Sequence, residues 1–407
     1  MLQTIFYLFA SFIGVYINVW YLLLIFEKKP LFFKARKPKK LPKVSILIPA
    51  HNEEAVIGQT LDSILNIDYP KGKLDIIVID NGSTDNTSKI VKKFSNVKLV
   101  KQKKPGKAKA LNNGLKFATG KIIGVLDADT LVAKNCLKKT VGYFEDPKVG
   151  AVTNFVKVDS KKGLLGKMQN IEYLFSAITK KLVSFLDSMY IVPGTLSLIR
   201  GKLTREIGFS EDTLTEDMDI ALSISKKDYK IVNCLDTVAY TNIPKNFKTL
   251  TSQRIRWYRG FIQNSIKHRD LFLNKKFPHL TFVIPMSFVA IFIGTIIFFL
   301  SLGQVVNAIT LFSKSIFYMS FSDQVSLALV SIPRTIIRML SSYLFIAFIL
   351  VFSTSFTVLF VSLKSLRKTN KADILLLPVY MLAYYFLIML YWVFAIMLEL
   401  IRWRKKW

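Results

Sequence analysis

The sequence predicts an α/β domain with a mostly parallel sheet, joined to a transmembrane α-helical region. Of its 407 residues, 51% are hydrophobic, and this composition is too apolar for an ordinary soluble protein. Strand and helix patterns alternate in the one long stretch that lacks a segment of membrane-spanning length. We therefore expect a transmembrane helix at 1–26, an α/β domain ending in an interfacial helix at 27–276, and a transmembrane region of three or four helices at 277–407.

Uncharged apolar segments predict at least four membrane crossings. Each is long enough to cross a hydrocarbon core of about 30 Å as a helix. The segments are Leu2–Phe26, Leu280–Gly303, Met339–Leu363 and Ile374–Met397. Charged residues, Arg334 and Arg338 among them, interrupt the stretch 304–338. We expect that stretch to be either an interfacial segment or a fifth crossing.

Basic residues directly after the first span predict the orientation. A run of lysines and arginines from Lys28 to Lys43 stands against the single acid Glu27, and basic flanks stay on the cytoplasmic side. The domain is therefore expected in the cytosol, in an integral protein of the plasma membrane. Part of the formal net charge of +30 then serves topology and attraction to anionic membrane lipids rather than nucleic-acid binding. The basic clusters 364–371 and 402–406 would exchange sides if a fifth crossing exists.

The domain itself shows a strand and helix alternation that predicts βαβ units. Such units form a mostly parallel sheet covered by helices, and ligands bind beyond the carboxyl ends of its strands. The predicted strands are Val44–Ile48, Leu74–Ile79, Val97–Val100 and Lys121–Leu126, and the predicted helices are Glu53–Asn66, Thr84–Phe94 and Lys107–Ala118.

Polar residues follow the first two strands of this sheet. Asp80-Asn81-Gly82-Ser83 comes after the second strand, and the first ends in Pro49 to Glu53. A turn explains the Asp-Asn-Gly sequence on its own. Because the two strand ends lie side by side in a parallel sheet, we assign Asp80 and Glu53 to the binding of a nucleoside donor.

Asp127 and Asp129 directly follow the apolar strand Lys121–Leu126. With a strand's period of two, both carboxylates point the same way. Mg²⁺ or Mn²⁺ takes one or two carboxylates and completes its shell with substrate phosphates, so we expect the pair to hold such a metal against a nucleoside diphosphate. The alternative is a solvated strand end without function.

Thr215-Glu216-Asp217 opens an apolar-periodic run and reads as the start of a helix. Thr215 as N-cap with acids in the first turn is favourable capping chemistry and needs no catalysis to explain it. The functional alternative makes Asp217 the general base that takes a proton from an acceptor hydroxyl, with Glu216 beside the acceptor.

Gln253, Arg256 and Trp257 share one face of a predicted helix from about Phe247 to about His268. Their spacing of i, i+3 and i+4 presents an amide, a guanidinium suited to phosphate oxygens and an indole plane suited to a sugar ring. An interfacial helix with a snorkelling Arg and a Trp anchor is the alternative.

Together these motifs resemble the processive members of glycosyltransferase family 2, which include cellulose, chitin, hyaluronan and poly-N-acetylglucosamine synthases. The resemblance covers about Val44–Gly260 and the arrangement of membrane spans. It rests on four motifs in a fixed order, Asp80, Asp127–Asp129, Thr215–Asp217 and Gln253–Trp257. It implies a GT-A fold for the cytosolic domain, a UDP-sugar donor, a divalent metal, and a growing polysaccharide or a lipid as acceptor.

The resemblance also implies roles for individual residues. Asp80 would contact the uridine, Asp127 and Asp129 would hold the diphosphate and the metal, and Asp217 would be the base. Arg256 and Trp257 would belong to the donor and acceptor sites.

Two further segments match the family pattern less closely. Val192–Thr195 stands where relatives carry a small-residue acceptor motif, but its amino-acid sequence differs from that motif. Lys107 and Lys109 stand in the position of a basic donor-site stretch, but solvated lysines before a helix explain them equally well, so neither is placed in the core site.

Three functions are compatible with this pattern. The preferred one is an inverting polysaccharide synthase that uses UDP-N-acetylglucosamine or UDP-glucose. The second is a non-processive transferase that glycosylates a lipid such as a polyprenyl phosphate or a ceramide-like acceptor. The third is a basic membrane scaffold with an inert sugar-nucleotide domain. A P-loop ATPase and a dinucleotide oxidoreductase are disfavoured, because the sequence contains no GxxxxGK[ST] loop and no GxGxxG after a strand.

Overall fold

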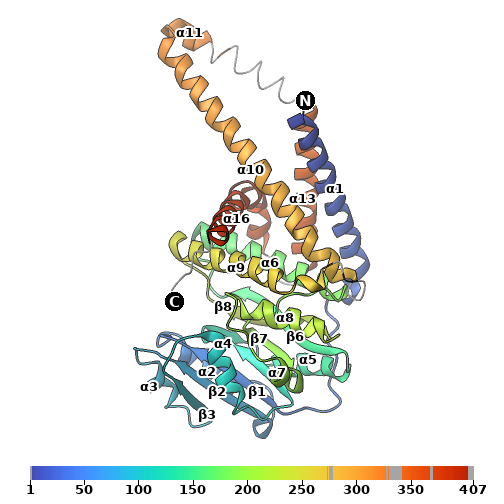
Figure 1. Cartoon of the computed structure of the whole chain (residues 1–407), viewed down its shortest axis with the longest axis vertical. Helices are drawn as coiled ribbons and strands as arrows, with labels where there is room; N and C mark the ends of the chain where they lie inside the picture. Colours follow the sequence, from blue (N-terminus) through green and yellow to red (C-terminus); the bar gives the residue numbers. More distant parts are fainter. Residues whose placement is uncertain are drawn as a thin grey trace. The chain divides into compact units, whose positions relative to one another are not determined.

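The computed structural model describes residues 2–272, 274, 278–326, 329, 342–366 and 370–401. The chain divides into two compact units, which Figure 1 shows coloured along the sequence. One unit comprises Met1–Glu27 and Met286–Val393, and the other comprises Lys28–Pro285 and Phe394–Trp407.

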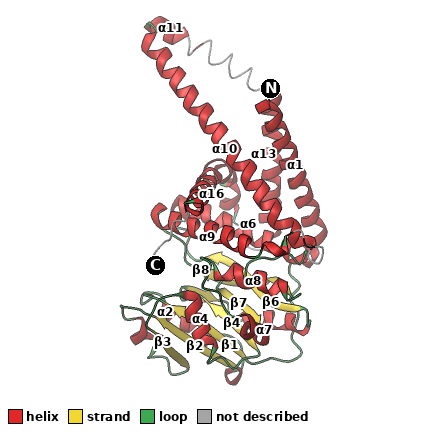
Figure 2. Cartoon of the chain, viewed as in Figure 1, coloured by secondary structure: helices red, strands yellow, loops and turns green. Residues whose placement is uncertain are grey.

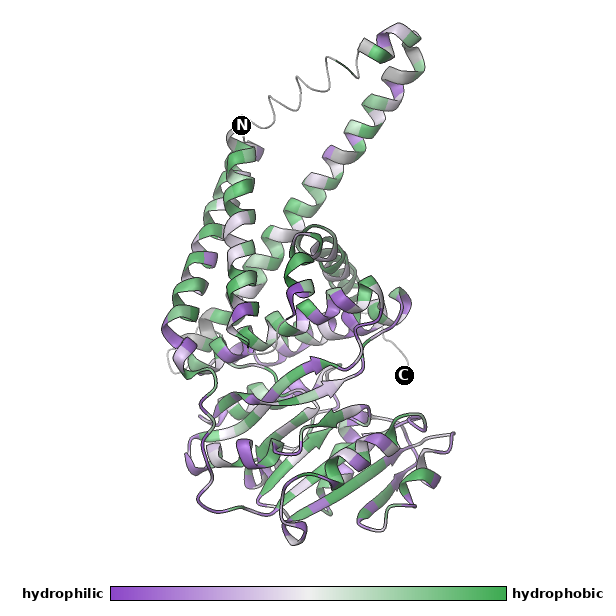
Figure 3. Ribbon diagram, turned by 180° about the vertical axis from the view of Figure 1, so that it is seen from behind, coloured by the Kyte–Doolittle hydropathy of each residue, from purple (hydrophilic) through white to green (hydrophobic). Residues whose placement is uncertain are grey.

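The first unit is helical, as expected. Within the described residues, four helical segments are long and apolar enough to cross a membrane, namely Gln3–Leu31, Val283–Lys314, Leu344–Ser365 and Leu377–Leu400. Figure 3 shows apolar residues along these helices. Their elements are α1 (Leu2–Lys28), α10 (Pro278–Tyr318), α11 (Phe321–Ser326), α13 (Tyr343–Ser365), α14 (Lys371–Leu375), α15 (Leu377–Val379), a π-helical turn (Tyr380–Tyr384) and α16 (Tyr385–Leu400).

The stretch 304–338, expected as an interfacial or fifth crossing segment, begins as a continuation of a span. Helix α10 runs without a break through Tyr318, and α11 follows it. Arg334 and Arg338 lie outside the described residues, as do most of the two basic clusters that bear on the number of crossings.

The second unit contains an eight-stranded sheet in the order β3-β2-β1-β4-β7-β6-β8-β5. The strands β3, β2, β1 and β4 are parallel to one another, and β6 is parallel to β8. Strand β7 is antiparallel to both β4 and β6, and β5 is antiparallel to β8. The bounds are β1 Val44–Ala50, β2 Leu74–Asn81, β3 Val97–Gln102, β4 Ile122–Leu126, β5 Thr130–Val132, β6 Val149–Val158, β7 Thr195–Arg200 and β8 Lys230–Thr241.

The mostly parallel sheet is thus confirmed, with antiparallel strands inserted after β4. Figure 2 shows the strands of this unit with helices on both faces. The helices are α2 Ile57–Leu65, α3 Thr87–Val91, α4 Lys107–Leu115, α5 Cys136–Thr140, α6 Gly163–Phe185, α7 Gly201–Ile207, α8 Glu216–Lys226 and α9 Phe247–Lys267, and the 3₁₀ turns are Lys29–Leu31, Lys71–Lys73, Val141–Glu145 and Arg269–Leu271.

Alternating side chains of the strands build a core on each face of the sheet. In β1, Ile46 and Ile48 pack with α2, whereas Leu47 packs with α4 on the opposite face. The second core also contains Ile220 and Ile224 of α8. This packing fixes the N-termini of α4 and α8 at the edge of the sheet where β4 ends.

Candidate functional site

Asp127 and Asp129 lie in a turn between β4 and β5, not on a continuing strand. The first residue of α4, Lys107, places its Nζ atom 2.7 Å from Oδ1 of Asp127 and 3.0 Å from Oε1 of Glu216. Lys107 therefore bridges the end of β4 and the first residue of α8. Lys107, which its sequence position alone leaves outside the predicted core site, thus lies between two of the predicted site residues.

The acids around this bridge repel one another. Burial raises the pKa of Asp129 to about 6, with a further contribution from Asp127. Burial also raises the pKa of Glu53 to about 7, together with Asp129 and Asp127. Burial alone would lower the pKa of Lys107, but Asp127 and Glu216 raise it above its usual range. Glu53, Asp127 and Asp129 thus lie close enough to form one negative region, against which Lys107 is held as a cation.

Asp217 lies in the first turn of α8, at the predicted helix start. Burial raises the pKa of its carboxyl to about 6, and Glu216 adds to the rise, whereas Lys107 and Arg256 oppose it. A carboxylate with a pKa near the working pH is suited to general-base catalysis. The structure therefore brings Asp217 of α8 within electrostatic reach of Lys107 in α4 and Arg256 in α9.

Thr215 occupies the N-cap position of α8, as predicted, but its side chain makes no capping bond. Instead Asn264 of α9 donates Nδ2 to Oγ1 of Thr215 at 2.9 Å and to its carbonyl oxygen at 3.0 Å. A Cβ on Gly260 would lie 2.2 Å from the same Oγ1. The close contact between α9 and Thr215 thus depends on a glycine.

The segment Val192–Thr195 contacts both Asp127 and Asp217 through its backbone. The Val192 amide donates to the carbonyl oxygen of Asp217 at 3.1 Å, and the Asp127 amide donates to the carbonyl oxygen of Gly194 at 2.7 Å. A Cβ on Gly194 would lie 2.3 Å from Oδ1 of Asp127. A glycine is therefore required at position 194, because its backbone packs against the Asp127 carboxylate.

Asp80 is the penultimate residue of β2 and pairs with Ala50 of β1 and Lys101 of β3. Its carboxylate accepts from the Ser83 amide at 2.8 Å and from the Ser88 hydroxyl. Burial would raise the pKa of Asp80, but these hydrogen bonds hold it below its usual range. Asp80 is therefore a fixed anion that shapes the loop after β2. Nearby, His51 forms a hydrogen bond with the carbonyl oxygen of Asn81 through Nδ1 at 3.0 Å.

Arg254 organises the predicted face of α9. This fully buried residue donates Nη2 to Oε2 of Glu172 at 2.5 Å and Nη1 to Oε1 of Gln253 at 2.6 Å. Its guanidinium also stacks over the Trp257 ring, 4.3 Å from the centroid. Gln253 and Trp257 are thus held in place by Arg254. Arg254 is not among the residues predicted from the sequence, although it stands at i−3 from Trp257.

Helix α6 carries further titratable groups near the predicted site residues. Burial raises the pKa of Tyr173 to about 12, Arg254 opposes the rise, and Glu172, Asp129 and Asp127 add to it. Burial lowers the pKa of Lys180, against the attraction of Asp217 and Glu172. These groups place α6 alongside both the acidic residues and the α9 face. The apolar pattern of α6 gave no signal for a functional role.

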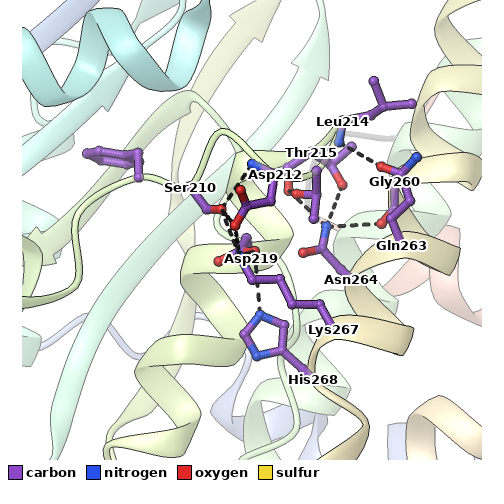
Figure 4. A network of polar contacts seen from close by, with 12 residues as sticks. Ser210, Asp212, Leu214, Thr215, Asp219, Gly260, Gln263, Asn264, Lys267 and His268 are labelled. Atoms are coloured by element: carbon purple, nitrogen blue, oxygen red, sulfur yellow. Dashed lines mark hydrogen bonds and ion pairs between the residues drawn. The ribbon is translucent and has the colours of Figure 1, made fainter. Parts of the chain in front are cut away.

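A polar network fastens the segment 210–219 to the C-terminal half of α9 (Figure 4). Lys267 Nζ lies 2.7 Å from both Ser210 Oγ and Asp219 Oδ2, and His268 Nε2 lies 3.5 Å from the same Asp219 oxygen. Burial would raise the pKa of Asp219, but His268 and Lys267 hold it below its usual range. The network fixes α8, and with it Asp217, against α9.

The residues around Asp127 suit a hard divalent cation. Asp129 and Glu53 are partly buried carboxylates whose pKa values are raised by burial and, to a smaller extent, by neighbouring negative charge, and a cation would relieve that repulsion. Among the described residues, no three His, Cys, Asp or Glu side chains form a complete metal cage. Mg²⁺ and Mn²⁺ need only one or two protein carboxylates when substrate phosphates complete the shell. The donor set therefore fits a metal that is bound together with a nucleoside diphosphate.

Comparison with known proteins identifies relatives of this domain. Residues 45–208 match the profile of the family described as glycosyl transferase family 2. The chain is 37% identical over 234 residues to a probable glycosyltransferase of Bacillus subtilis, covering 54% of this chain and 56% of the relative. It is 32% identical over 224 residues to a poly-β-1,6-N-acetyl-D-glucosamine synthase of Staphylococcus epidermidis, covering 53% of this chain and 54% of the relative. The chain thus spans about half the length of the curated relatives it matches.

Among solved structures, a mannosyltransferase of Pyrobaculum calidifontis in complex with GDP-Man and Mn²⁺ superposes with a TM-score of 0.57 at 22% identity, covering 89% of this chain and 100% of that one. This similarity supports the GT-A-type fold of the sheet and its helices.

Proposed function

Because the chain carries a glycosyltransferase family 2 domain over residues 45–208, we propose that it is a membrane-bound, inverting polysaccharide synthase with its catalytic domain on the cytosolic side of the plasma membrane. The proposed donor is UDP-N-acetylglucosamine. Support for this donor comes from the relative that is named a poly-β-1,6-N-acetyl-D-glucosamine synthase. Support for the membrane location comes from the four apolar helices of the described residues.

The observation that carries the proposal is the convergence at one end of the sheet. Lys107 links Asp127 to Glu216 at 2.7 and 3.0 Å, and Asp217 follows Glu216 in the chain. Acids that suit a metal-bound diphosphate, Asp127 and Asp129, thus lie near Asp217, whose pKa is raised to about 6. A sugar transferase that inverts the anomeric centre needs this combination of a leaving-group site and one base.

In the proposed reaction, Asp217 removes the proton of an acceptor hydroxyl while that oxygen bonds to the anomeric carbon of the donor sugar. The bond between the anomeric carbon and the diphosphate oxygen breaks at the same time, so the configuration inverts. Arg256 and Lys107 offset the negative charge that develops on the departing diphosphate. Trp257, held by Arg254, offers an apolar ring face for the acceptor sugar.

Asp127 and Asp129 would hold a divalent cation at this site. Bound Mg²⁺ or Mn²⁺ supplies Lewis-acid stabilisation of the diphosphate leaving group. The protein's own contribution is to keep both carboxylates beside the end of β4, with Asp127 fixed by Lys107 and Gly194.

Nucleoside diphosphate release by the purified protein tests the proposal. We expect release from UDP-N-acetylglucosamine to exceed that from UDP-glucose and GDP-mannose, to stop with EDTA, and to return with Mg²⁺ or Mn²⁺. Mass analysis of the product separates the candidate acceptors. A ladder of oligosaccharides identifies a polymerase, whereas one glycolipid identifies the non-processive transferase. If no donor releases its diphosphate, the proposal is overturned and the membrane scaffold with an inert sugar-nucleotide domain is favoured.

A further inference from the structure

The last turn of α16 contains an acid whose position is unfavourable for the helix itself. Glu399 is the penultimate residue of α16, and the last turn contains no basic residue. A carboxylate at a helix C-terminus faces the negative end of the helix dipole. Glu399 also lies at the end of the candidate membrane span Leu377–Leu400, where an acid is costly unless it is paired. The contacts of Glu399 must therefore offset two penalties.

Both contacts of this carboxylate come from α9. Arg259 donates Nε to Oε1 of Glu399 at 2.5 Å, and Gln263 donates Nε2 to the same oxygen at 2.9 Å. Arg259 is 6% exposed and Glu399 is 21% exposed, so the pair is largely shielded from water. All three residues belong to the unit that contains the catalytic domain, because Phe394–Trp407 clusters with it.

Gln263 continues the contact toward the proposed base. While its Nε2 atom donates to Glu399, its Oε1 atom accepts from the Leu214 amide at 3.0 Å. Leu214 immediately precedes Thr215, whose Oγ1 accepts from Asn264 at 2.9 Å. The amide of Gln263 can satisfy both partners in only one orientation, because its nitrogen donates and its oxygen accepts. An acceptor on α16 therefore sets which end of the amide faces Leu214.

From these contacts we infer that Glu399 is a positioning residue for the Leu214–Asp217 segment, and that it acts through the oriented amide of Gln263. This inference rests on the proposed function, because the segment it positions contains the proposed base Asp217. The C-terminal end of a membrane helix thereby fixes the backbone before the base. A loss of the carboxylate on α16 lets the Gln263 amide turn, and the Leu214 amide then loses its acceptor.

A simple anchor of α16 on α9 would use the same ion pair, so the test must separate the two roles. Reversal of the pair, Arg259→Glu with Glu399→Arg, preserves the opposite charges and places a cation at the helix C-terminus, where the dipole favours it. The arginine at position 399 would donate to Gln263 and draw its oxygen away from Leu214. The reversal therefore restores the ion pair between α16 and α9, but it inverts the orientation of the Gln263 amide.

The second variant, Gln263→Leu, keeps the Arg259–Glu399 pair and removes only the amide. Lys227→Gln serves as control, because the pair of Lys227 with Glu206 is half exposed and lies at the far end of α8. Each full-length variant is purified in detergent, its thermal unfolding is recorded, and kcat and donor KM are measured with UDP-N-acetylglucosamine. Deuterium uptake of peptides covering 213–217 is followed in the same samples.

For both the reversed pair and Gln263→Leu we expect faster exchange over 213–217 and a fall in kcat of about ten- to hundredfold, with donor KM within about twofold of the unmodified value. The control should match the unmodified protein in exchange, kcat and donor KM. Recovery of normal exchange and kcat by the reversed pair would overturn the inference in favour of a simple anchor. Deuterium exchange is measured without turnover. If the unmodified protein shows no transferase activity but the variants still exchange faster over 213–217, the proposed function fails while this inference stands.

Discussion

The proposed role of Asp217 as base depends on its surroundings, since an exposed aspartate has a pKa well below neutral. Burial and Glu216 raise the pKa of Asp217 to about 6, against Lys107 and Arg256. A carboxylate with a pKa of about 6 is a better base for a hydroxyl than an ordinary carboxylate.

Asp217→Asn should reduce kcat by about 10²–10⁴-fold, because the amide cannot accept the acceptor proton. Binding of UDP, measured by calorimetry, should change little. Asp228→Asn is the matched control, since Asp228 follows α8 and its side chain is 55% exposed beside Lys148. Normal turnover in Asp217→Asn would remove this residue from the mechanism.

The pH dependence of the reaction follows from the same carboxyl. The raised pKa of about 6 belongs to Asp217 in the folded protein, and only the deprotonated form is a base. The kcat should therefore be on a plateau above this pKa and fall as the pH decreases through about 6. A profile that stays flat down to pH 4.5 would show that another group accepts the proton.

Lys107 neutralises part of an otherwise acidic region. Lys107→Met should raise donor KM by about tenfold, because Asp127 and Glu216 lose their shared cation and repel the diphosphate. Lys107→Arg should retain part of the affinity through its charge. Lys116→Met, an exposed lysine at the other end of α4, is the control, and equal KM values for the two methionine variants would contradict this role.

At the scale of elements, the catalytic arrangement depends on how closely α9 approaches α8. Gly260→Ala should destabilise the protein by about 1–3 kcal/mol, because the added Cβ overlaps Thr215 and must displace one helix. Activity should fall with it. Gly58→Ala in α2 is the control, since its nearest neighbour is Ile90 Cγ2 at 3.8 Å, and it should be neutral or slightly stabilising. Thermal unfolding of the two variants checks this, and equal midpoints would contradict the close contact.

The elements also show where prediction from sequence succeeded. The first half of the domain has short-range periodicity with turn signals, so β1 to β4 and α2 to α4 were predicted within a few residues of their bounds. The antiparallel insertion of β7 was not predicted, because its partners β4 and β6 are set by long-range packing. Periodicity within a segment carries no information about such partners.

The candidate site divides in the same way. Motif residues such as Asp127 and Asp217 stand at strand and helix ends, which local patterns reveal. Lys107 was left outside the predicted core site and Arg254 was not considered, because their partners, Glu216 and Glu172, come from distant helices. A lysine at a helix start looks solvated until the fold brings the acids to it. The predicted roles of Gln253 and Trp257 stay predictions, now with Arg254 as the residue that holds both.

At the scale of the whole molecule, the proposal requires the catalytic domain to face the cytosol. A cysteine introduced by Lys37→Cys should not react with a membrane-impermeant maleimide in intact cells and should react after lysis, because the proposed orientation keeps the basic run after α1 inside. Ser320→Cys, beyond the candidate span Val283–Lys314, should react in intact cells. The native Cys136 and Cys234 are buried and should give little background. The reverse labelling pattern would overturn the orientation.

The central claim is a single inverting displacement by one base at the end of the sheet. The anomeric configuration of the product tests it most directly. The purified protein is supplied with UDP-α-N-acetylglucosamine, a divalent cation and an oligosaccharide acceptor, and the new linkage is examined by NMR. The account predicts a β linkage. An α linkage, which would require two displacements or another mechanism, or hydrolysis of the donor without a new linkage, would contradict it.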